Sequence, residues 1–103
     1  MSIQNFAQEI AYSNDGIVSK QILKKKAGNV TLFAFDREQE LTEHTSPFDA
    51  LIQVLEGRAT ISIAGKAIHL NAGEAILLPA NIPHAVQAPE KFKMLLTMIK
   101  SAE

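Results

Sequence analysis

Short runs of hydrophobic residues, many alternating with polar ones, follow one another from about residue 30 onward. Alternation indicates a strand with one buried face, and short runs separated by turn residues are typical of a sandwich or barrel. In residues 58–63, Ala59, Ile61 and Ile63 share one face and polar residues the other. The pattern predicts strands at residues 30–35, 51–55, 58–63, 67–70, 75–78 and 92–99, with residues 58–70 forming a hairpin.

The last of these runs, residues 92–99, is hydrophobic at both parities. A strand of this kind is covered on both faces. One face would look into the barrel, and the other would meet the N-terminal segment or a partner subunit. We therefore expect a homodimer.

The first 29 residues follow a different pattern. Hydrophobic residues recur there at helical spacing, at Ile3, Phe6, Ala7, Ile10 and Ala11. With Ser2 as the N-cap, this spacing predicts a short helix. We expect residues 1–29 to be a segment packed on the barrel and residues 30–103 to be the barrel domain, because 103 residues fit a single domain.

Composition and charge narrow the class of protein. Hydrophobic residues make up 47% and charged residues 20%, which is ordinary for a folded domain. The net charge of −1 provides no field for polyanions, and the cluster Lys24, Lys25 and Lys26 lacks neighbouring aromatic residues. We expect no nucleic-acid partner.

The absence of cysteine excludes disulfides, thiolate metal sites and cysteine nucleophiles. Residues 1–12 have neither the basic region nor the apolar run of a signal peptide. No apolar stretch approaches the roughly 20 residues that span a bilayer. We expect a cytoplasmic protein with no membrane partner.

Two motifs in residues 44–88 resemble those of the cupins. The first cupin motif reads His-x-His, three or four residues, Glu, six residues, Gly, and here His44, Ser46, Ala50 and Gly57 stand at its positions. The second reads Gly, five residues, Pro-x-Gly, two residues, His, three residues, Asn.

The positions of the second motif are occupied here by Gly73, Pro79, Asn81 and His84. The two motifs are separated by the 15 residues between Gly57 and Gly73. The chain thus resembles a small single-domain cupin of the type-2, RmlC-like group. The resemblance implies an all-β fold, a single antiparallel, jelly-roll-like β-barrel with one central pocket. Asn81 replaces the family's glycine, and asparagine also tolerates a left-handed backbone.

The resemblance also implies a metal held by three histidines and one glutamate. His44 and His84 keep two of these positions and are the candidate ligands for one divalent ion such as Fe, Mn, Ni or Zn. Ser46 and Ala50 occupy the other two. Asp49 and Gln53 lie at the opposite parity from residue 50, so either would face inward only if a bulge after Pro47 reversed the strand.

Each histidine also has an interpretation that needs no metal. His44 can form a hydrogen bond at the start of a strand, and His84 can lie in a turn at the barrel mouth. His69, on an alternating strand, is expected at the surface or an interface. Glu43 is expected to be solvated.

Inward-facing residues predict a small-molecule pocket. The candidate substrate-binding residues are Ser46, Ile52, Val54, Ile61 and Ile63. An apolar cavity with a few convergent polar groups is the usual form of such a site. Ser and Ala in place of two ligands would make it roomier and less charged, which favours a neutral or anionic organic ligand with an aromatic or aliphatic part.

Two main functions remain open from the sequence. One is a binding module that holds a small molecule, with or without a weakly held divalent metal. The other is a metal-dependent cupin enzyme of the dioxygenase or isomerase type, because open metal positions serve Lewis-acid catalysis. A third and weaker hypothesis uses the doubly apolar last strand to bind a different protein. No nucleophile–base pair is evident, so no catalytic residue is assigned.

Overall fold

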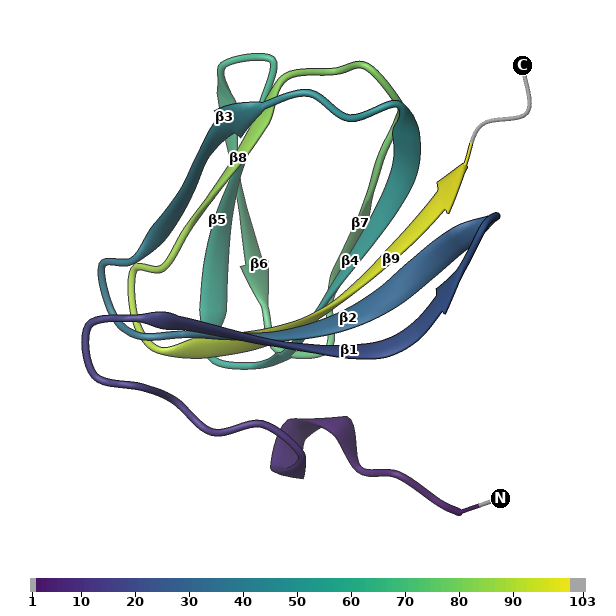
Figure 1. Ribbon diagram of the computed structural model, residues 1–103. Helices are drawn as coiled ribbons and strands as arrows, with labels where there is room; N and C mark the ends of the chain where they lie inside the picture. The colour runs from purple at the N-terminus through teal and green to yellow at the C-terminus, as the bar shows by residue number, and fades with distance from the viewer. Residues whose placement is uncertain (1, 101–103) are drawn as a thin grey trace.

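The computed structural model describes residues 2–100. It is built almost entirely of antiparallel strands (Figure 1). The strands are β1 (Ile17–Lys25), β2 (Gly28–Phe35), β3 (Glu40–His44), β4 (Phe48–Glu56), β5 (Arg58–Ile63), β6 (Lys66–Asn71), β7 (Ala75–Leu78), β8 (His84–Gln87) and β9 (Phe92–Lys100). Within this part of the chain no helix is long and apolar enough to cross a membrane.

The strands form two sheets that face each other. The five-stranded sheet has the order β1-β2-β9-β4-β7, and the four-stranded sheet has the order β3-β8-β5-β6. The predicted fold class, an all-β, jelly-roll-like barrel, is confirmed. The predicted hairpin is β5–β6, in which Ile61 pairs with Ile68. Three strands were not predicted: β1, β3 and β8.

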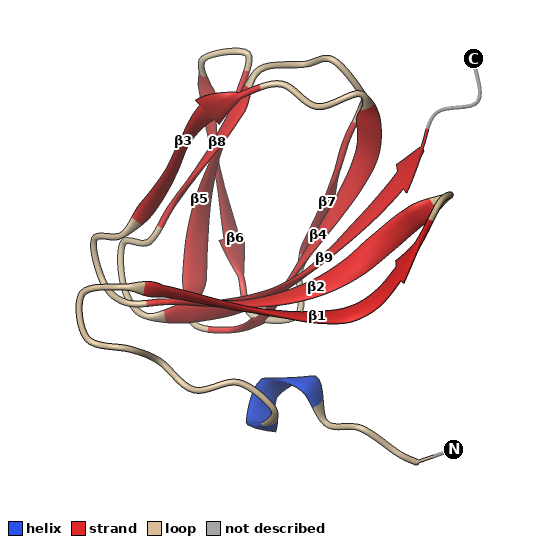
Figure 2. Cartoon of the chain, in the orientation of Figure 1, coloured by secondary structure: helices blue, strands red, loops and turns tan. Residues whose placement is uncertain are grey.

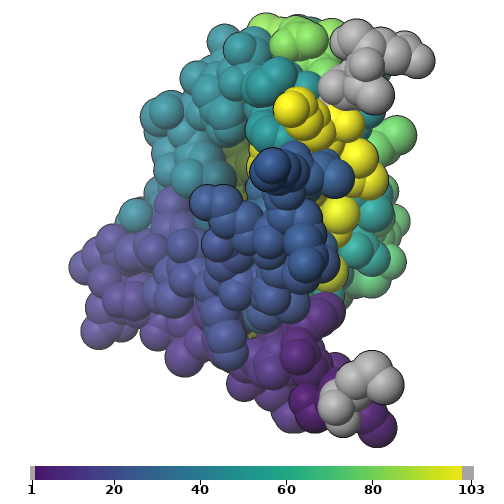
Figure 3. Space-filling view, turned by 45° about the vertical axis from the view of Figure 1, so that its right-hand side comes forward, coloured from purple at the N-terminus to yellow at the C-terminus, as the bar shows by residue number. Residues whose placement is uncertain are grey.

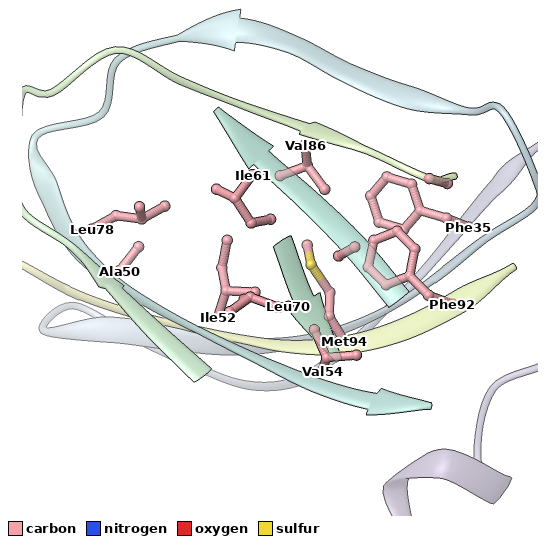
Figure 4. Close-up of a cluster of buried hydrophobic side chains, with 12 residues drawn as sticks. Phe35, Ala50, Ile52, Val54, Ile61, Leu70, Leu78, Val86, Phe92 and Met94 are labelled. Carbon is pink, nitrogen blue, oxygen red and sulfur yellow. The ribbon is translucent and has the colours of Figure 1, made fainter. Parts of the chain in front are cut away.

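The inward faces of both sheets form one hydrophobic core, which is packed most tightly at one end. Phe35 and Phe92 stack there with ring centroids 4.5 Å apart. Along β9, Phe92 and Met94 are buried, whereas Leu96 and Met98 are only partly buried. Figure 4 shows the two phenylalanines at one side of the core. The barrel therefore has a closed end and, opposite it, a more open end that we call the mouth.

The predicted N-terminal helix is reduced to a single 3-10 turn, Phe6–Gln8 (Figure 2). Its N-cap is Asn5 rather than Ser2, and the Asn5 side chain makes no capping hydrogen bond. Phe6 and Ile10 pack on the outer face of the five-stranded sheet. Contact with the sheet outweighs the helical spacing, because so short a helix is marginal on its own.

A polar cluster fastens this segment to the barrel. The Tyr12 hydroxyl donates a hydrogen bond to Glu56 at 2.6 Å. The Lys93 ammonium, in a residue only 8% exposed, donates to the carbonyl oxygen of Ala7 and lies 3.6 Å from the Glu56 carboxylate. The buried lysine is thus compensated both by a carboxylate and by the segment that covers it.

We predict that Gly57→Ala destabilises the protein more than Gly65→Ala. Both glycines have positive φ, +75° and +83°, so either alanine costs about 1–2 kcal/mol of backbone strain. At Gly57 a Cβ would also overlap the carbonyl oxygen of Lys91, whereas at Gly65 nothing lies within 4 Å. The overlap should add about 1–3 kcal/mol. Urea unfolding followed by circular dichroism measures both variants, and equal losses would contradict the prediction.

We also predict that Tyr12 stays protonated while the protein is folded. Burial, the hydrogen bond to Glu56 and the negative charges of Glu56 and Glu90 raise the pKa of Tyr12 well above its usual range. Because folding favours the neutral phenol, its contribution to stability is complete below the unfolded pKa of about 10 and is lost above it.

Tyr12 is the one tyrosine of the chain, so phenolate absorbance reports on it alone. The absorbance should rise only as alkaline unfolding begins, and Tyr12→Phe should flatten the alkaline loss of stability. A phenolate that forms near its ordinary pKa in the folded protein would show that the contact with Glu56 is weak.

Candidate functional site

His44 and His84 lie side by side at the mouth. His44 ends β3, His84 begins β8, and the two residues are directly opposite in this antiparallel pair. Their ring centroids are 4.4 Å apart with an interplanar angle of 60°. His84 alternates with the buried residues Val86 and Ala88 and is half-buried, so it faces the barrel interior. His44 lies on the same face as its cross-strand partner, and its side chain is exposed to solvent.

Both rings are held by hydrogen bonds to the backbone. The Nδ1 atom of His44 lies 2.8 Å from the carbonyl oxygen of Thr42, and that of His84 lies 3.0 Å from the carbonyl oxygen of Ile82. A carbonyl oxygen only accepts, so each Nδ1 carries a proton. In the neutral imidazoles the Nε2 atoms then keep their lone pairs, the usual arrangement when a histidine binds through Nε2.

Ser46 joins the two loops that border the mouth. Its hydroxyl oxygen accepts a hydrogen bond from the Phe48 amide at 3.2 Å, and its carbonyl oxygen accepts one from the Asn81 amide at 2.8 Å. Asn81 has φ of 66°, the left-handed conformation expected at this position. The loop after β3 and the loop before β8, which carry the two histidines, are therefore tied to each other.

The donors at the mouth do not match a metal held by three or four protein ligands. Ala50, at the glutamate position, is 4% exposed and belongs to the core. Asp49 is exposed and accepts a hydrogen bond from the Ala80 amide at 2.9 Å. Gln53 shares the parity of Asp49, and the irregularity of β4 lies between Val54 and Glu56 rather than after Pro47.

No bulge therefore turns Asp49 or Gln53 inward. Among residues 2–100, no group of three or more His, Asp or Glu side chains could hold a metal ion. His44 and His84 remain as two donors without a third protein ligand from such side chains. The donor set does not fit a resident ion of the kind that the cupin resemblance implies.

The candidate substrate-binding residues lie at two depths in the barrel. Ile63 is partly buried and lies directly opposite His84 on β5, beside the histidine pair. Ile52, Val54 and Ile61 are 1%, 2% and 0% exposed and lie deeper, inside the core. Figure 4 shows these three among the packed side chains.

Sequence reasoning identified Ala50 on the opposite wall but missed its neighbours there, Met98 and Leu78. Ala50 pairs with Met98 on β9 and with Leu78 on β7, at the end of the sheet nearest the mouth. Met98 is partly buried against the core. Strand parity in residues 92–99 could have identified Met98, because it alternates with the buried Phe92 and Met94.

The remaining candidates lie outside the barrel. His69 is exposed on β6, with its Nδ1 3.1 Å from the Thr60 hydroxyl on the neighbouring strand. Glu43 is also exposed. Neither belongs to the mouth.

Comparisons with known proteins agree with the overall fold. The family model described as a cupin domain matches residues 31–100. A conserved protein of unknown function from Streptococcus pyogenes is 33% identical, with a TM-score of 0.93 over 99% of this chain and 90% of that one. A cupin 2 conserved barrel domain protein from Leptotrichia buccalis is 40% identical, with a TM-score of 0.89, over 91% of this chain but 46% of that one. A search of curated proteins finds no match.

The hydrogen bonds at the mouth predict the tautomers of its histidines. At a pH where all three histidines are neutral, His44 and His84 should carry the proton on Nδ1. Two-bond ¹H–¹⁵N correlation spectra distinguish the two ring nitrogens, and His44→Gln and His84→Gln variants assign the signals. A proton on Nε2 of either ring would contradict the free lone pairs inferred above.

Proposed function

The chain belongs to the cupin domain family, and from that premise we propose that it binds a small organic molecule at the mouth of its barrel. His44 and His84 would bind the polar group of the ligand. Ser46 and Ile63 would lie beside it, with Ile52, Val54 and Ile61 as the floor.

One observation carries the proposal: two imidazoles, one half-buried and one exposed, lie side by side at the mouth with their Nδ1 atoms already hydrogen-bonded. As neutral rings, they accept hydrogen bonds through Nε2 from a hydroxyl or amine. A ring that gains a proton donates instead, and so suits a carboxylate. The pair can therefore bind either kind of polar group.

The surroundings of the pair suit an apolar remainder of the ligand. Ile63 lies next to His84, and Met98 and Ala50 belong to the facing sheet. Sites with a few convergent polar groups on an apolar wall are the common form of small-molecule site. A molecule with one polar end and an aliphatic or aromatic body fits this combination.

The metal-dependent enzyme is the alternative implied by the family. It needs at least one further ligand on the inner wall, and a hydroxyl and a methyl group stand where the family has histidine and glutamate. A divalent ion at His44 and His84 would be held by two protein donors and bound weakly. The binding function therefore suits these residues better than catalysis by a resident ion.

Native mass spectrometry of the full-length protein as purified tests the proposal. We expect a co-purifying small molecule in the wild type, and a loss of roughly tenfold or more of its occupancy in His84→Gln. His69→Gln is the matched control, because His69 lies on β6 of the same four-stranded sheet and its side chain is exposed to solvent. It should retain the molecule.

Two further measurements decide between the functions. A thermal-shift screen with aliphatic and aromatic carboxylates and phenols should raise the unfolding temperature of the wild type and of His69→Gln but not of His84→Gln. Elemental analysis is done on the same samples. About one iron, manganese, nickel or zinc per chain that survives dialysis and is lost in His84→Gln would overturn the binding function in favour of the enzyme.

A further inference from the structure

A row of four residues crosses the inner face of the four-stranded sheet at the mouth. The strand registers place in line, with one residue from each strand, His44, His84, Ile63 and Lys66. Lys66 is the first residue of β6 and shares the parity of Leu70, which belongs to the core. Because residues of one parity share a face of the sheet, Lys66 lies on the inward face. The row of the histidine pair therefore ends in an ammonium group at the rim.

The facing sheet has a lysine at its own rim. Lys100 is the last residue of β9 and is opposite Phe48, the first residue of β4. Lys100 has the parity of Met98, and Phe48 has the parity of Ala50, so both lie on the inward face. Figure 3 shows the yellow end of β9 at the surface of the molecule, beside the blue β1–β2 hairpin. Each wall of the mouth thus carries one lysine.

The fold does not use either ammonium group. Within residues 2–100, neither Lys66 nor Lys100 takes part in an ion pair or a side-chain hydrogen bond, and both are exposed. The Lys100 amide donates to the carbonyl oxygen of Ala27 at 2.7 Å, so the backbone at the end of β9 is held in place. Both lysines are therefore positioned by the strands while their charged groups stay available.

The nearby carboxylates do not share this face. Glu43 is exposed and directly precedes His44, which gives it the opposite parity. Asp49 also has the opposite parity to Ala50, and it accepts the hydrogen bond of the Ala80 amide. Among residues 2–100, the acidic side chains at these strand ends thus lie away from the inward face. The positive charge at the rim remains available to an anion.

We propose that the ligand of the mouth is a hydroxycarboxylate with an apolar body, and that Lys66 and Lys100 are further binding residues that hold its carboxylate. The inference rests on the binding function proposed above and names the class of ligand. The hydroxyl of the ligand donates to an Nε2 atom of the histidine pair. Its apolar body lies against the facing wall, where Phe48 and Met98 share the inward face.

The two kinds of polar side chain require two kinds of polar group in the ligand. A neutral imidazole with its proton on Nδ1 offers an acceptor at Nε2, whereas an ammonium group only donates. A carboxylate only accepts, so it matches the lysines, and a hydroxyl has the proton that Nε2 needs. A simple phenol would leave the lysines unused, and a simple carboxylate would leave the Nε2 atoms unused. A hydroxycarboxylate satisfies both.

The spacing of the walls allows one carboxylate to meet both lysines. Facing sheets lie about 10 Å apart. Lysine carries its charge on a long flexible stem, so ammonium groups from the two rims can approach one anion between them. Such exposed charges act mainly on recognition, and added salt screens them.

Titrations of the full-length protein followed by NMR test the class of ligand. The probes are mandelate and the three hydroxybenzoates, each compared with its neutral primary amide, and phenylacetate, which lacks the hydroxyl. The ring signals of His84 report on the mouth. We expect at least one hydroxycarboxylate to bind on the order of tenfold more tightly than its amide, and added salt to weaken the carboxylate alone. Phenylacetate should bind more weakly than mandelate.

Variants of the two lysines test their role. Lys66→Gln and Lys100→Gln should each lower the affinity for the carboxylate about two- to fivefold, as expected of an exposed ion pair, and leave that for the amide unchanged. Neither should alter the circular dichroism or thermal unfolding. Lys20→Gln is the matched control, because Lys20 is exposed and is opposite Leu32 on the outer face. It should bind like the wild type.

The outcomes separate this inference from the binding function itself. If amides bind as tightly as acids, or if neither lysine variant changes the affinity for the carboxylate while His84→Gln abolishes it, the role of the lysines is overturned and the binding function stands. A panel that leaves the His84 signals unmoved would also overturn the inference. Native mass spectrometry of the purified protein then decides separately whether the mouth binds a small molecule.

Discussion

The register of β8 is the constraint on which the mouth depends. β8 lies between β3 and β5, and its first residue, His84, is opposite both His44 and Ile63. Side chains alternate along a strand, so a slip of one residue would turn His84 to the outside. Val86 and Ala88 prevent the slip, because they are 2% and 3% exposed and would lose their burial. The hydrophobic core thus fixes the position of the polar pair.

The loops at the mouth are held to each other by hydrogen bonds that involve backbone groups. The carbonyl oxygen of Ser46 accepts from the Asn81 amide, Asp49 accepts from the Ala80 amide, and the Ala64 amide donates to the Pro83 carbonyl. These bonds join three connections that lie far apart in the sequence. The histidines are therefore preorganised by the fold itself, which lowers the entropy lost when a ligand orders the site.

The sequence predicted the strands that are rich in hydrophobic residues, whether they alternate or are hydrophobic at both parities. β5 alternates clearly, and the cupin motifs alone are enough to identify His44 and His84. β1, β3 and β8 were missed because much of β1 and β3 is exposed and polar, and β8 has four residues directly after a proline-containing loop. The prediction of an N-terminal helix was wrong because Phe6 and Ile10 pack on a sheet surface that is formed by residues far away in the sequence. Asp49 was correctly expected to face away, but the role of Ser46 in joining two loops was not visible, since it depends on a backbone bond to Asn81.

Alanine at position 50 links the stability of the barrel to the function that we propose. A carboxylate at this buried position would need a cation or several hydrogen bonds to offset its desolvation. Ala50 instead packs in the core between Leu78 and Met98, so the interior at this depth needs no ion to be stable. The wall opposite the histidines is then apolar, and the Nε2 atoms of His44 and His84 keep lone pairs that no described contact uses. The proposed ligand, with a donor for these atoms and an apolar body for that wall, would complete the polar and the hydrophobic contacts at once.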